Sequence, residues 1–484
     1  NFLAASDTVT ITAAFDEAMT STPTISIANT SISNEVMTKI IGGIGTGSTS
    51  LLGSELVGIP NYNHTDILFG SAVSMSSDGS IVAIGAPKQG RNFKGEAKVY
   101  RFQSGAWVQL GQSIEGPDTS GHRAGKSVSL SSDGTRLVVG FDIARSTKGD
   151  VRIYDWNGNQ WVQIGGTIEG NEGTFGHSVS ISSDGTRVAI GAPKANRVRN
   201  SGGAFAYGGQ VRIYEYQVIS GTATWTQLGT DINGSTTNTQ YDFYGDRTGF
   251  SVSLSGDGSK VAIESIGKSR GRGLPHVQVF EYTPSGVSSW TQLGQTLGSG
   301  GSLANDGGHA VSLSFDGSRV VIGRANAIPG NVDIYDYTPS GSTSWTQVGP
   351  IIGDLGQPGI NNDDDRIGWS VSISSDGSTI AIGGRESLLG GAVEIWKSKI
   401  ISGTTTWTQI GSDILADGSG DQFGYSVSLS GDGTKVAIGG INYDVGSSNT
   451  SNEGHVRIYS ITESEAYEYT WDVDSGGAPS DGTY

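Results

Sequence analysis

One segment recurs seven times along the chain, and this repeat limits the folds that are open to it. The copy at Phe175 reads FGHSVSISSDGTRVAIGAP, and its relatives begin at Phe69, Gly125, Gly249, Gly308, Gly368 and Phe423. Each copy contains one Asp-Gly pair, and successive pairs lie 51 to 73 residues apart. Such self-similarity is the signature of a repeat architecture, in which each copy forms one supersecondary unit.

Each copy predicts two strands joined by a tight turn. In SVSIS, Val179 and Ile181 alternate with serines, which is the period of a strand with one apolar face. Asp-Gly favours a short hairpin because both residues can adopt a positive φ. RVAIG then supplies a second strand, QVRIY (210–214) a third and TWTQLG (224–229) a fourth. Seven units of four antiparallel strands predict an all-β fold, a seven-bladed β-propeller.

Tryptophan marks the fourth strand in six of the repeats. A large side chain at this position can cover the interface between neighbouring blades, so we expect a structural role for it. Stacking against a sugar is the alternative, which the distance of the outer strand from the axis disfavours. These residues are Trp107, Trp161, Trp225, Trp290, Trp345 and Trp407.

The seventh repeat has no fourth strand after HVRIYSI (455–461). The segment STSLLGSELVG (48–58) matches TWTQLGTDING (224–234), with Glu55 aligned on Asp231 and Thr49 in the place of tryptophan. We therefore predict that this N-terminal strand completes the last blade and closes the ring, which leaves no unpaired edge there.

Composition limits the function classes. The net charge of −17 and the pI of about 4.7 disfavour nucleic-acid binding by the whole molecule. The absence of cysteine excludes disulfides and thiolate chemistry. No apolar run approaches the roughly 18 residues that span a bilayer, so an export signal or anchor is expected outside this sequence.

The repeats resemble the FG-GAP family, which forms the propellers of integrin α-subunits and of many bacterial surface proteins. Phe69-Gly70, Phe175-Gly176 and Phe423-Gly424 match the first element of the motif, and Gly85-Ala86-Pro87 and Gly191-Ala192-Pro193 match the second. The resemblance implies a propeller over residues 46–461. Integrin-type blades often bind calcium through a DxDxDG loop, whereas the single Asp of each turn here disfavours calcium at those turns.

The flanks are similar to a bacterial Ig-like repeat of the kind found in large adhesins. DTVTITAAFDEAMTSTPTISI (7–27) alternates apolar residues as sandwich strands do, and YEYTWDVDSGGAPSDGTY (467–484) adds a further strand. The resemblance implies a split sandwich, with its first half in residues 1–45 and its second in 462–484. The propeller is then an insertion between the halves, which a closed ring permits because its two ends adjoin.

The sequence offers little for catalysis. It has no metalloprotease motif, no nucleophile elbow and no phosphate-binding loop. The six histidines are scattered without metal-ligand spacing, so we interpret each as a surface or turn residue: His64, His122, His177, His276, His309 and His455.

Basic residues concentrate in the loops between the second and third strands, which share one face of such propellers with the loops between blades. A positive sector on an acidic protein favours an anionic ligand, although solvated loops paired with acids are an equal alternative. The candidate ligand-binding residues are Lys88, Arg91, Lys194, Arg197, Lys268, Arg270, Arg324 and Arg385.

The loops that precede blades six and seven are acidic. Clustered carboxylates can bind calcium through oxygen ligands, so Asp363, Asp365, Asp417 and Asp421 are candidate calcium ligands, with a plain charged turn as the alternative. Calcium is the only cofactor that the sequence suggests.

Together these features predict a non-enzymatic, extracellular adhesion module of a large bacterial surface protein. Its propeller loops would bind a surface glycan or a protein. The alternative is a structural subunit of a surface filament or sheath, in which Ig-like halves join neighbouring repeats or copies by strand addition. A third hypothesis is that the propeller is a lyase or a hydrolase. Nucleic acid is not an expected partner, and no membrane span is expected in the chain.

Overall fold

The computed structural model describes residues 38–44, 47–59, 67–90, 93–117, 121–142, 148–171, 173–199, 205–236, 245–267, 275–284, 289–298, 310–325, 330–339, 344–349, 352–353, 367–385, 390–401, 404–418, 420–443, 452–463 and 465–470. Within these ranges every named element is a β-strand. No helix there is long and apolar enough to cross a membrane.

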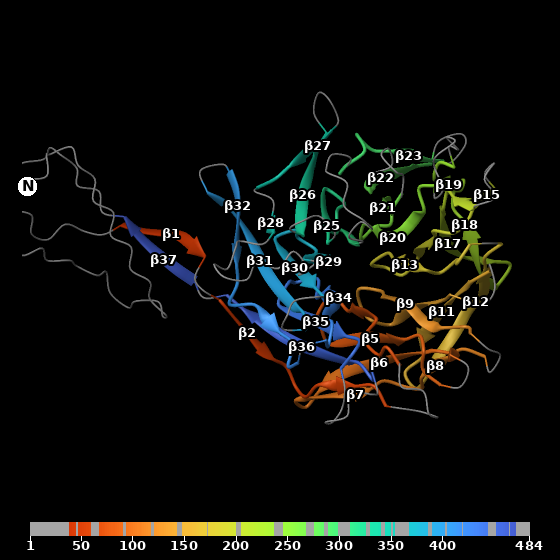
Figure 1. Ribbon diagram of the computed structural model, residues 1–484, viewed down its shortest axis with the longest axis horizontal. Helices are drawn as coiled ribbons and strands as arrows, with labels where there is room; N and C mark the ends of the chain where they lie inside the picture. The colour runs from red at the N-terminus through yellow and green to blue at the C-terminus, as the bar shows by residue number, and fades with distance from the viewer. Residues whose placement is uncertain are drawn as a thin grey trace, which may run out of the picture.

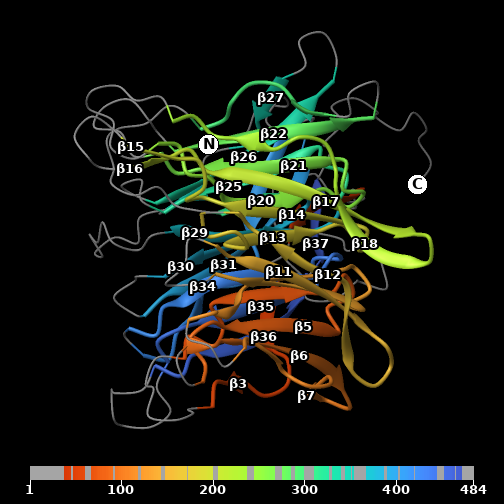
Figure 2. The same ribbon diagram turned by 90° about the vertical axis from the view of Figure 1, so that its right-hand side faces the viewer.

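Seven antiparallel sheets are arranged around a common axis, which confirms the predicted propeller (Figure 1). Figure 2 shows successive sheets stacked face against face. The innermost strands of neighbouring sheets contact one another around the whole ring. From blade one to blade seven they are β4 (Ala72–Met75), β9 (Ala124–Leu130), β13 (Ser178–Ile181), β20 (Thr248–Leu254), β24 (Ala310–Leu313), β29 (Ile367–Ile373) and β34 (Phe423–Leu429).

Each blade continues outward through three more strands. The second strands are β5 (Ile81–Ala86), β10 (Arg136–Phe141), β14 (Arg187–Ala192), β21 (Lys260–Ser265), β25 (Arg319–Arg324), β30 (Thr379–Gly384) and β35 (Lys435–Gly440). The third are β6 (Glu96–Gln103), β11 (Asp150–Trp156), β17 (Gln210–Ile219), β22 (His276–Thr283), β26 (Asn331–Thr338), β31 (Ala392–Ile401) and β36 (His455–Thr462).

The fourth strands of blades one to six are β7 (Ala106–Gln109), β12 (Trp161–Glu169), β18 (Thr222–Gln227), β23 (Ser289–Gln292), β27 (Ser344–Gln347) and β32 (Thr404–Gln409). Short strands that pair again with the third strand follow in several blades: β8 (Ile114–Glu115), β19 (Ile232–Asn233), β28 (Ile352–Gly353) and β33 (Ile414–Leu415). A separate hairpin, β15 (Arg197–Arg199) and β16 (Phe205–Tyr207), projects from blade three.

The N-terminal segment closes the ring as predicted. Strand β2 (Ser48–Leu51) pairs antiparallel with β36, with Thr49 opposite Ile461, and β3 (Leu56–Val57) pairs with the start of β36. Blade seven therefore takes its outer strand from the beginning of the chain and the other three from its end. This pairing ties the chain ends of the propeller together without a covalent link.

A two-stranded ribbon extends from the closure point (Figure 1). Strand β1 (Thr38–Ile44) pairs antiparallel with β37 (Glu465–Thr470), so the two flanks meet where the ring closes. Residues 1–37 and 471–484, which carry most of the predicted Ig-like sandwich, lie outside the described residues. The sandwich therefore stays a prediction.

Serine hydroxyls join the blades around the axis. In every blade the middle serine of the innermost strand accepts a hydrogen bond from a backbone N–H of the next blade, at 2.9 to 3.2 Å. The seventh of these bonds runs from Met75 N–H to Ser428 and so joins blade seven to blade one. The serines are Ser74, Ser129, Ser180, Ser253, Ser312, Ser372 and Ser428.

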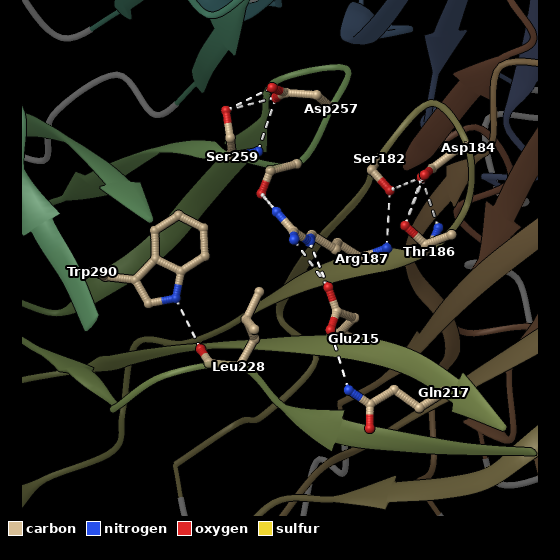
Figure 3. A network of polar contacts seen from close by, with 11 residues as sticks. Ser182, Asp184, Thr186, Arg187, Glu215, Gln217, Leu228, Asp257, Ser259 and Trp290 are labelled. Atoms are coloured by element: carbon tan, nitrogen blue, oxygen red, sulfur yellow. Dashed lines mark hydrogen bonds and ion pairs between the residues drawn. The ribbon is translucent and has the colours of Figure 1, made fainter. Parts of the chain in front are cut away.

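The Asp-Gly turns differ from the prediction in their backbone conformation. Only the glycine adopts a positive φ, for example 73° at Gly185, and its N–H donates to the Ser182 carbonyl. This is the four-residue turn followed by a left-handed residue that longer hairpin loops use. Asp184 does not need a positive φ because its role is to accept hydrogen bonds from the Ser182 hydroxyl and from both the N–H and the hydroxyl of Thr186 (Figure 3).

The tryptophans have the structural role that the sequence predicts. The Trp290 indole N–H donates to the Leu228 carbonyl of the preceding blade at 2.9 Å (Figure 3). Trp107, in the same way, donates to the Leu52 carbonyl at 2.8 Å, which ties blade one to the N-terminal segment. The hydrophobic clusters likewise lie between neighbouring sheets, so each blade needs its neighbours to bury its apolar face.

Glycines near the end of the second strand allow the blades to approach closely. A Cβ at Gly140 would lie 2.2 Å from the Gly176 carbonyl of the next blade, and similar clashes arise at Gly85, Gly191, Gly323, Gly383 and Gly439. Gly158 offers a contrast, because it has a φ of +95° and a Cβ there would meet nothing within 4 Å.

We predict that Gly140→Ala destabilises the propeller by about 3 kcal/mol, because the methyl group forces two blades apart. Gly158→Ala is the matched control, and it should cost only about 1 kcal/mol, for the positive φ alone. Chemical denaturation of both variants checks this. Equal losses of stability would show that the contact between blades is not tight at Gly140.

Candidate functional site

The residue that follows the first glycine of each innermost strand differs chemically from blade to blade. We call these positions the inner ring; in the described blades they are Ser71, Lys126, His177, Phe250, Trp369 and Tyr425. The preceding glycine has a φ near +85°, for example 78° at Gly125 and 85° at Gly176. The strand bends there, and the bulge it makes changes the register between strands, as between Gly140 and Phe141 of blade two.

Neighbouring members of the inner ring contact each other across the blade boundaries. The His177 imidazole lies 4.7 Å from the Phe250 ring, and the Trp369 indole lies 5.7 Å from the Tyr425 ring. Because the innermost strands surround the axis, these contacts place chemically diverse side chains together at one end of it. The inner ring is therefore the candidate functional site of the propeller.

His177 is held beside a carboxylate from the preceding blade. Its Nδ1 lies 3.8 Å from Oδ2 of Asp142, and the two side chains are 18% and 9% exposed. This distance is too long for a hydrogen bond, but catalytic hydrogen bonds are often long without substrate and shorten when it binds. Asp142 directly follows β10, in the position that proline occupies in the Gly-Ala-Pro segments.

The surroundings of His177 favour its neutral form. Burial lowers the pKa of His177 below its ordinary value of 6.5, and the charges of Lys126 and Lys194 lower it further, against the opposing pull of Asp142. Burial raises the pKa of Asp142, but the contact with His177 and the charges of Lys126 and Arg123 outweigh it and lower this pKa. At neutral pH the pair is therefore a neutral imidazole beside an ionised carboxylate, the arrangement of a general base with an orienting acid.

Blade four carries a buried glutamate at a position where the other blades have glycine. Glu264 stands where the other six blades have the close-packed glycine, and it is 2% exposed. Burial raises the pKa of Glu264 well above its ordinary value of 4.5. Burial therefore favours the protonated form of this carboxyl group.

A second buried histidine belongs to the closure of the ring. His455, which is fully buried, contacts Glu55 through Nδ1 and stacks on the Tyr443 ring at 4.3 Å. Arg457 donates to Glu55 at 3.1 Å and also pairs with Asp417.

The same network recurs in blade three. There Arg212 donates to Asp231 at 3.0 Å, so Glu55 and Asp231 have the equivalent roles that their alignment implies. Burial raises the pKa of Glu55, but His455 and Arg457 together lower it. Because an equivalent pair exists inside an ordinary blade, we assign the His455 network to holding the N-terminal segment in place.

The five predicted basic residues that the structure describes lie in different surroundings, and a shared ligand site stays a prediction. Lys88 is a half-buried loop residue of blade one, Lys194 is exposed near His177, and Arg197 lies over the Phe205 ring at 4.2 Å. Arg324 pairs with Asp333 of its own blade at 2.6 Å, and Arg385 lies over Trp369 of the inner ring. Arg91, Lys268 and Arg270 lie outside the described residues.

Two of the four predicted calcium ligands lie in the described residues, close to each other in the loop before blade seven. Asp417 pairs with Arg457, and the buried Asp421 accepts the Gly418 N–H at 3.0 Å. Asp363 and Asp365 lie outside the described residues. In the part of the chain that the structure describes, no group of three or more His, Cys, Asp or Glu residues could hold a metal ion. Calcium, the partners and the extracellular location stay predictions.

The interpretation of all six histidines as surface or turn residues is wrong for His455, which lies in β36 and is fully buried. His177 lies in the turn directly before β13 and is half-buried. A signal for His177 was present in the sequence. When the seven copies are aligned on their first glycine, the next position varies among serine, lysine, histidine and aromatic residues, while the residue after it is always serine or alanine.

Comparison with known proteins gives a likeness in fold only. No family model and no curated protein matches this chain. Two similar solved structures are each described as a "putative 6-phosphogluconolactonase". The one from Bacteroides uniformis ATCC 8492 has 15% identity and a TM-score of 0.44 over 72% of this chain and 86% of that chain. The one from Bacteroides fragilis NCTC 9343 has 16% identity and a TM-score of 0.46 over 78% and 97%.

A third similar structure is a functionally unknown protein from Desulfotomaculum acetoxidans DSM 771, with 14% identity and a TM-score of 0.43 over 74% of this chain and 91% of that chain. Two of these three structures bear the name of an enzyme, whereas the sequence predicted a non-enzymatic adhesion module or a filament subunit. We therefore reject both predictions, and with them the prediction that the chain is not an enzyme. Because the likenesses are this distant, they assign no activity, and the function is argued from the chain's own residues.

We predict that His177 titrates below pH 6.5 in the folded protein. Lys126→Met should raise the pKa of His177 because it removes a positive charge that opposes protonation, and Asp142→Asn should lower this pKa because it removes a negative charge. Lys397→Met, in blade six, is the control and should leave the pKa unchanged. Two-dimensional NMR of the imidazole resonances measures all four titrations. A His177 pKa at or above 6.5 in the unmodified protein would contradict the assignment of a neutral base.

Proposed function

We propose that this propeller is an enzyme that hydrolyses an ester bond, lactones included, in a small anionic substrate at the inner ring. The observation that carries the proposal is the His177–Asp142 pair, a half-buried neutral imidazole beside an ionised carboxylate. A general base of this kind typically contributes a factor of about 10² to 10⁴ to a hydrolytic rate.

In the proposed reaction, a water molecule attacks the ester carbonyl carbon while His177 takes one of its protons. Asp142 orients the imidazole and stabilises the imidazolium that forms. The bond between the carbonyl carbon and the ester oxygen then breaks, and His177 returns the proton to the departing alkoxide. The products are an alcohol and a carboxylic acid, which releases its proton to solvent at neutral pH. One ring-opened molecule carries both groups when the substrate is a lactone.

The charges around the pair support an anionic substrate. Lys126, Lys194 and Arg123 all lie close enough to shift the pKa of His177 or Asp142, so positive charge exceeds negative charge in this cluster. A cation beside the reacting carbonyl stabilises the oxyanion that develops during the attack. On a protein with a net charge of −17, such a local excess also attracts anions to this place rather than elsewhere.

The test is hydrolysis of glucono-1,5-lactone and its 6-phosphate, followed by the release of acid in a pH-stat. We expect catalysis above the spontaneous rate, and a loss of about 10²-fold or more in kcat for His177→Asn. His276→Asn, which changes a half-buried histidine of the third strand in blade four, is the matched control and should keep full activity. Spontaneous rates with the unmodified protein, or an unimpaired His177→Asn variant, would disprove the proposal.

We also propose that the repeats are of the FG-GAP type and that the flanks form one split Ig-like unit. The Phe-Gly and Gly-Ala-Pro elements support the first part, and the pairing of β1 with β37 beside the closure point supports the second.

If the flanks form one unit, residues 1–45 joined to 462–484 by a short Gly-Ser linker should fold without the propeller. Circular dichroism should then show a β-rich spectrum and a cooperative thermal transition. A random-coil spectrum would mean that the flanks depend on the propeller or on residues beyond them.

A further inference from the structure

A second chemically distinctive part of the inner ring lies at the boundary of blades six and seven. The Arg385 guanidinium lies over the Trp369 indole at 3.6 Å from its centroid and is 5.9 Å from the centroid of Tyr425. The two aromatic rings are tilted by 45° and contact each other across the blade boundary. We call these three residues the aromatic shelf.

The backbone brings these side chains together from three segments. Trp369 and Tyr425 are inner-ring residues of adjacent blades, and Arg385 directly follows β30, in the same structural position as Asp142 of blade two. Trp369, Arg385 and Tyr425 are all partly exposed rather than buried. The shelf therefore lies on the same ring as His177, with the intervening blades four and five between them on one side.

The geometry of the shelf suits an oxyanion. Stacking on Trp369 fixes the plane of the guanidinium, and a fixed planar fork matches the two oxygens of a carboxylate or phosphate. A guanidinium has five N–H donors and can bind more than one group at the same time. The exposed parts of the aromatic rings can pack against the C–H face of a small ring compound next to the anionic group.

We propose that Arg385 binds the carboxylate or phosphate of the substrate, with Trp369 and Tyr425 packing against its carbon skeleton. This inference rests on the proposed hydrolase function, because it supplies the substrate class of that reaction. The substrate is then an ester or lactone that carries a separate oxyanion, which anchors on the aromatic shelf while the ester carbonyl lies at His177. Arg385 determines specificity in this arrangement and takes no part in the proton transfers.

Binding is tested with compounds that cannot be hydrolysed, so that it is measured independently of the reaction. Isothermal titration calorimetry with glucose 6-phosphate, gluconate and glucose separates a phosphate, a carboxylate and a neutral ligand. We expect at least one of the two anions to bind and glucose to bind at least about tenfold more weakly, in line with the strength of a charge-assisted hydrogen bond. The preferred anion identifies the group that the shelf takes.

The decisive variant is Arg385→Met, which should weaken binding of that anion about tenfold or more. Arg197→Met is the matched control, because Arg197 also lies over an aromatic ring, Phe205, but outside the inner ring. Arg385→Lys keeps the positive charge but lacks the planar fork. Its affinity for the anion should lie between those of the unmodified protein and Arg385→Met. With a hydrolysed lactone phosphate, Arg385→Met should raise KM while changing kcat less, opposite to His177→Asn.

The outcomes separate the two proposals. Anion binding that depends on Arg385, without any lactone hydrolysis, would support the shelf as an anion site and disprove the hydrolase. No binding of either anion, or equal binding by the unmodified protein and a folded Arg385→Met variant, would overturn the shelf whether or not lactones are hydrolysed.

Discussion

The hydrogen bonds between serine hydroxyls and the backbone of the next blade determine how the rest of the molecule is arranged. Seven of them form a closed circuit around the axis, and the last one joins blade seven to blade one. A second circuit runs through the backbone of the Asp-Gly turns, from Ser77 N–H to the Ser132 carbonyl and onward until Asp432 N–H donates to the Ser77 carbonyl. Because both circuits are closed, every innermost strand stands at the same height, and equivalent residues meet at the same level of the axis.

The closed ring explains why one position of the repeat can vary more freely than its neighbours. Within each innermost strand, the serine bonds to the next blade and the apolar residues fill the space between blades. The residue after the first glycine neither bonds to the next blade through a serine hydroxyl nor fills the space between blades. It can therefore vary without loss of the fold. Lysine, histidine, phenylalanine, tryptophan and tyrosine occupy this position in blades two, three, four, six and seven. His177 contacts Phe250, and Trp369 contacts Tyr425, because their blades are adjacent.

Local patterns made most of the fold predictable from the sequence. The alternation in SVSIS, the recurring Asp-Gly and the repeated tryptophan are each local signals, and the alignment of Glu55 on Asp231 located the closing strand. The conformation of the Asp-Gly turn was not predictable in this way, because Asp184 is stabilised by hydrogen bonds to its neighbours rather than by a positive φ. The His177–Asp142 pair was missed because its members lie in different blades, and only the packing of blade two on blade three brings them together.

In the proposed reaction, the substrate binds at the inner ring. The general base lies between blades two and three, and the anion site lies between blades six and seven. The most direct test is a crystal structure of the protein with 6-phosphogluconate, the ring-opened product of a phosphorylated sugar lactone. The account predicts density at the inner ring, with the carboxylate beside His177 and Lys126 and the phosphate on Arg385. Density on the face of the Asp-Gly turns or on the outer strands, with an empty inner ring, would contradict it.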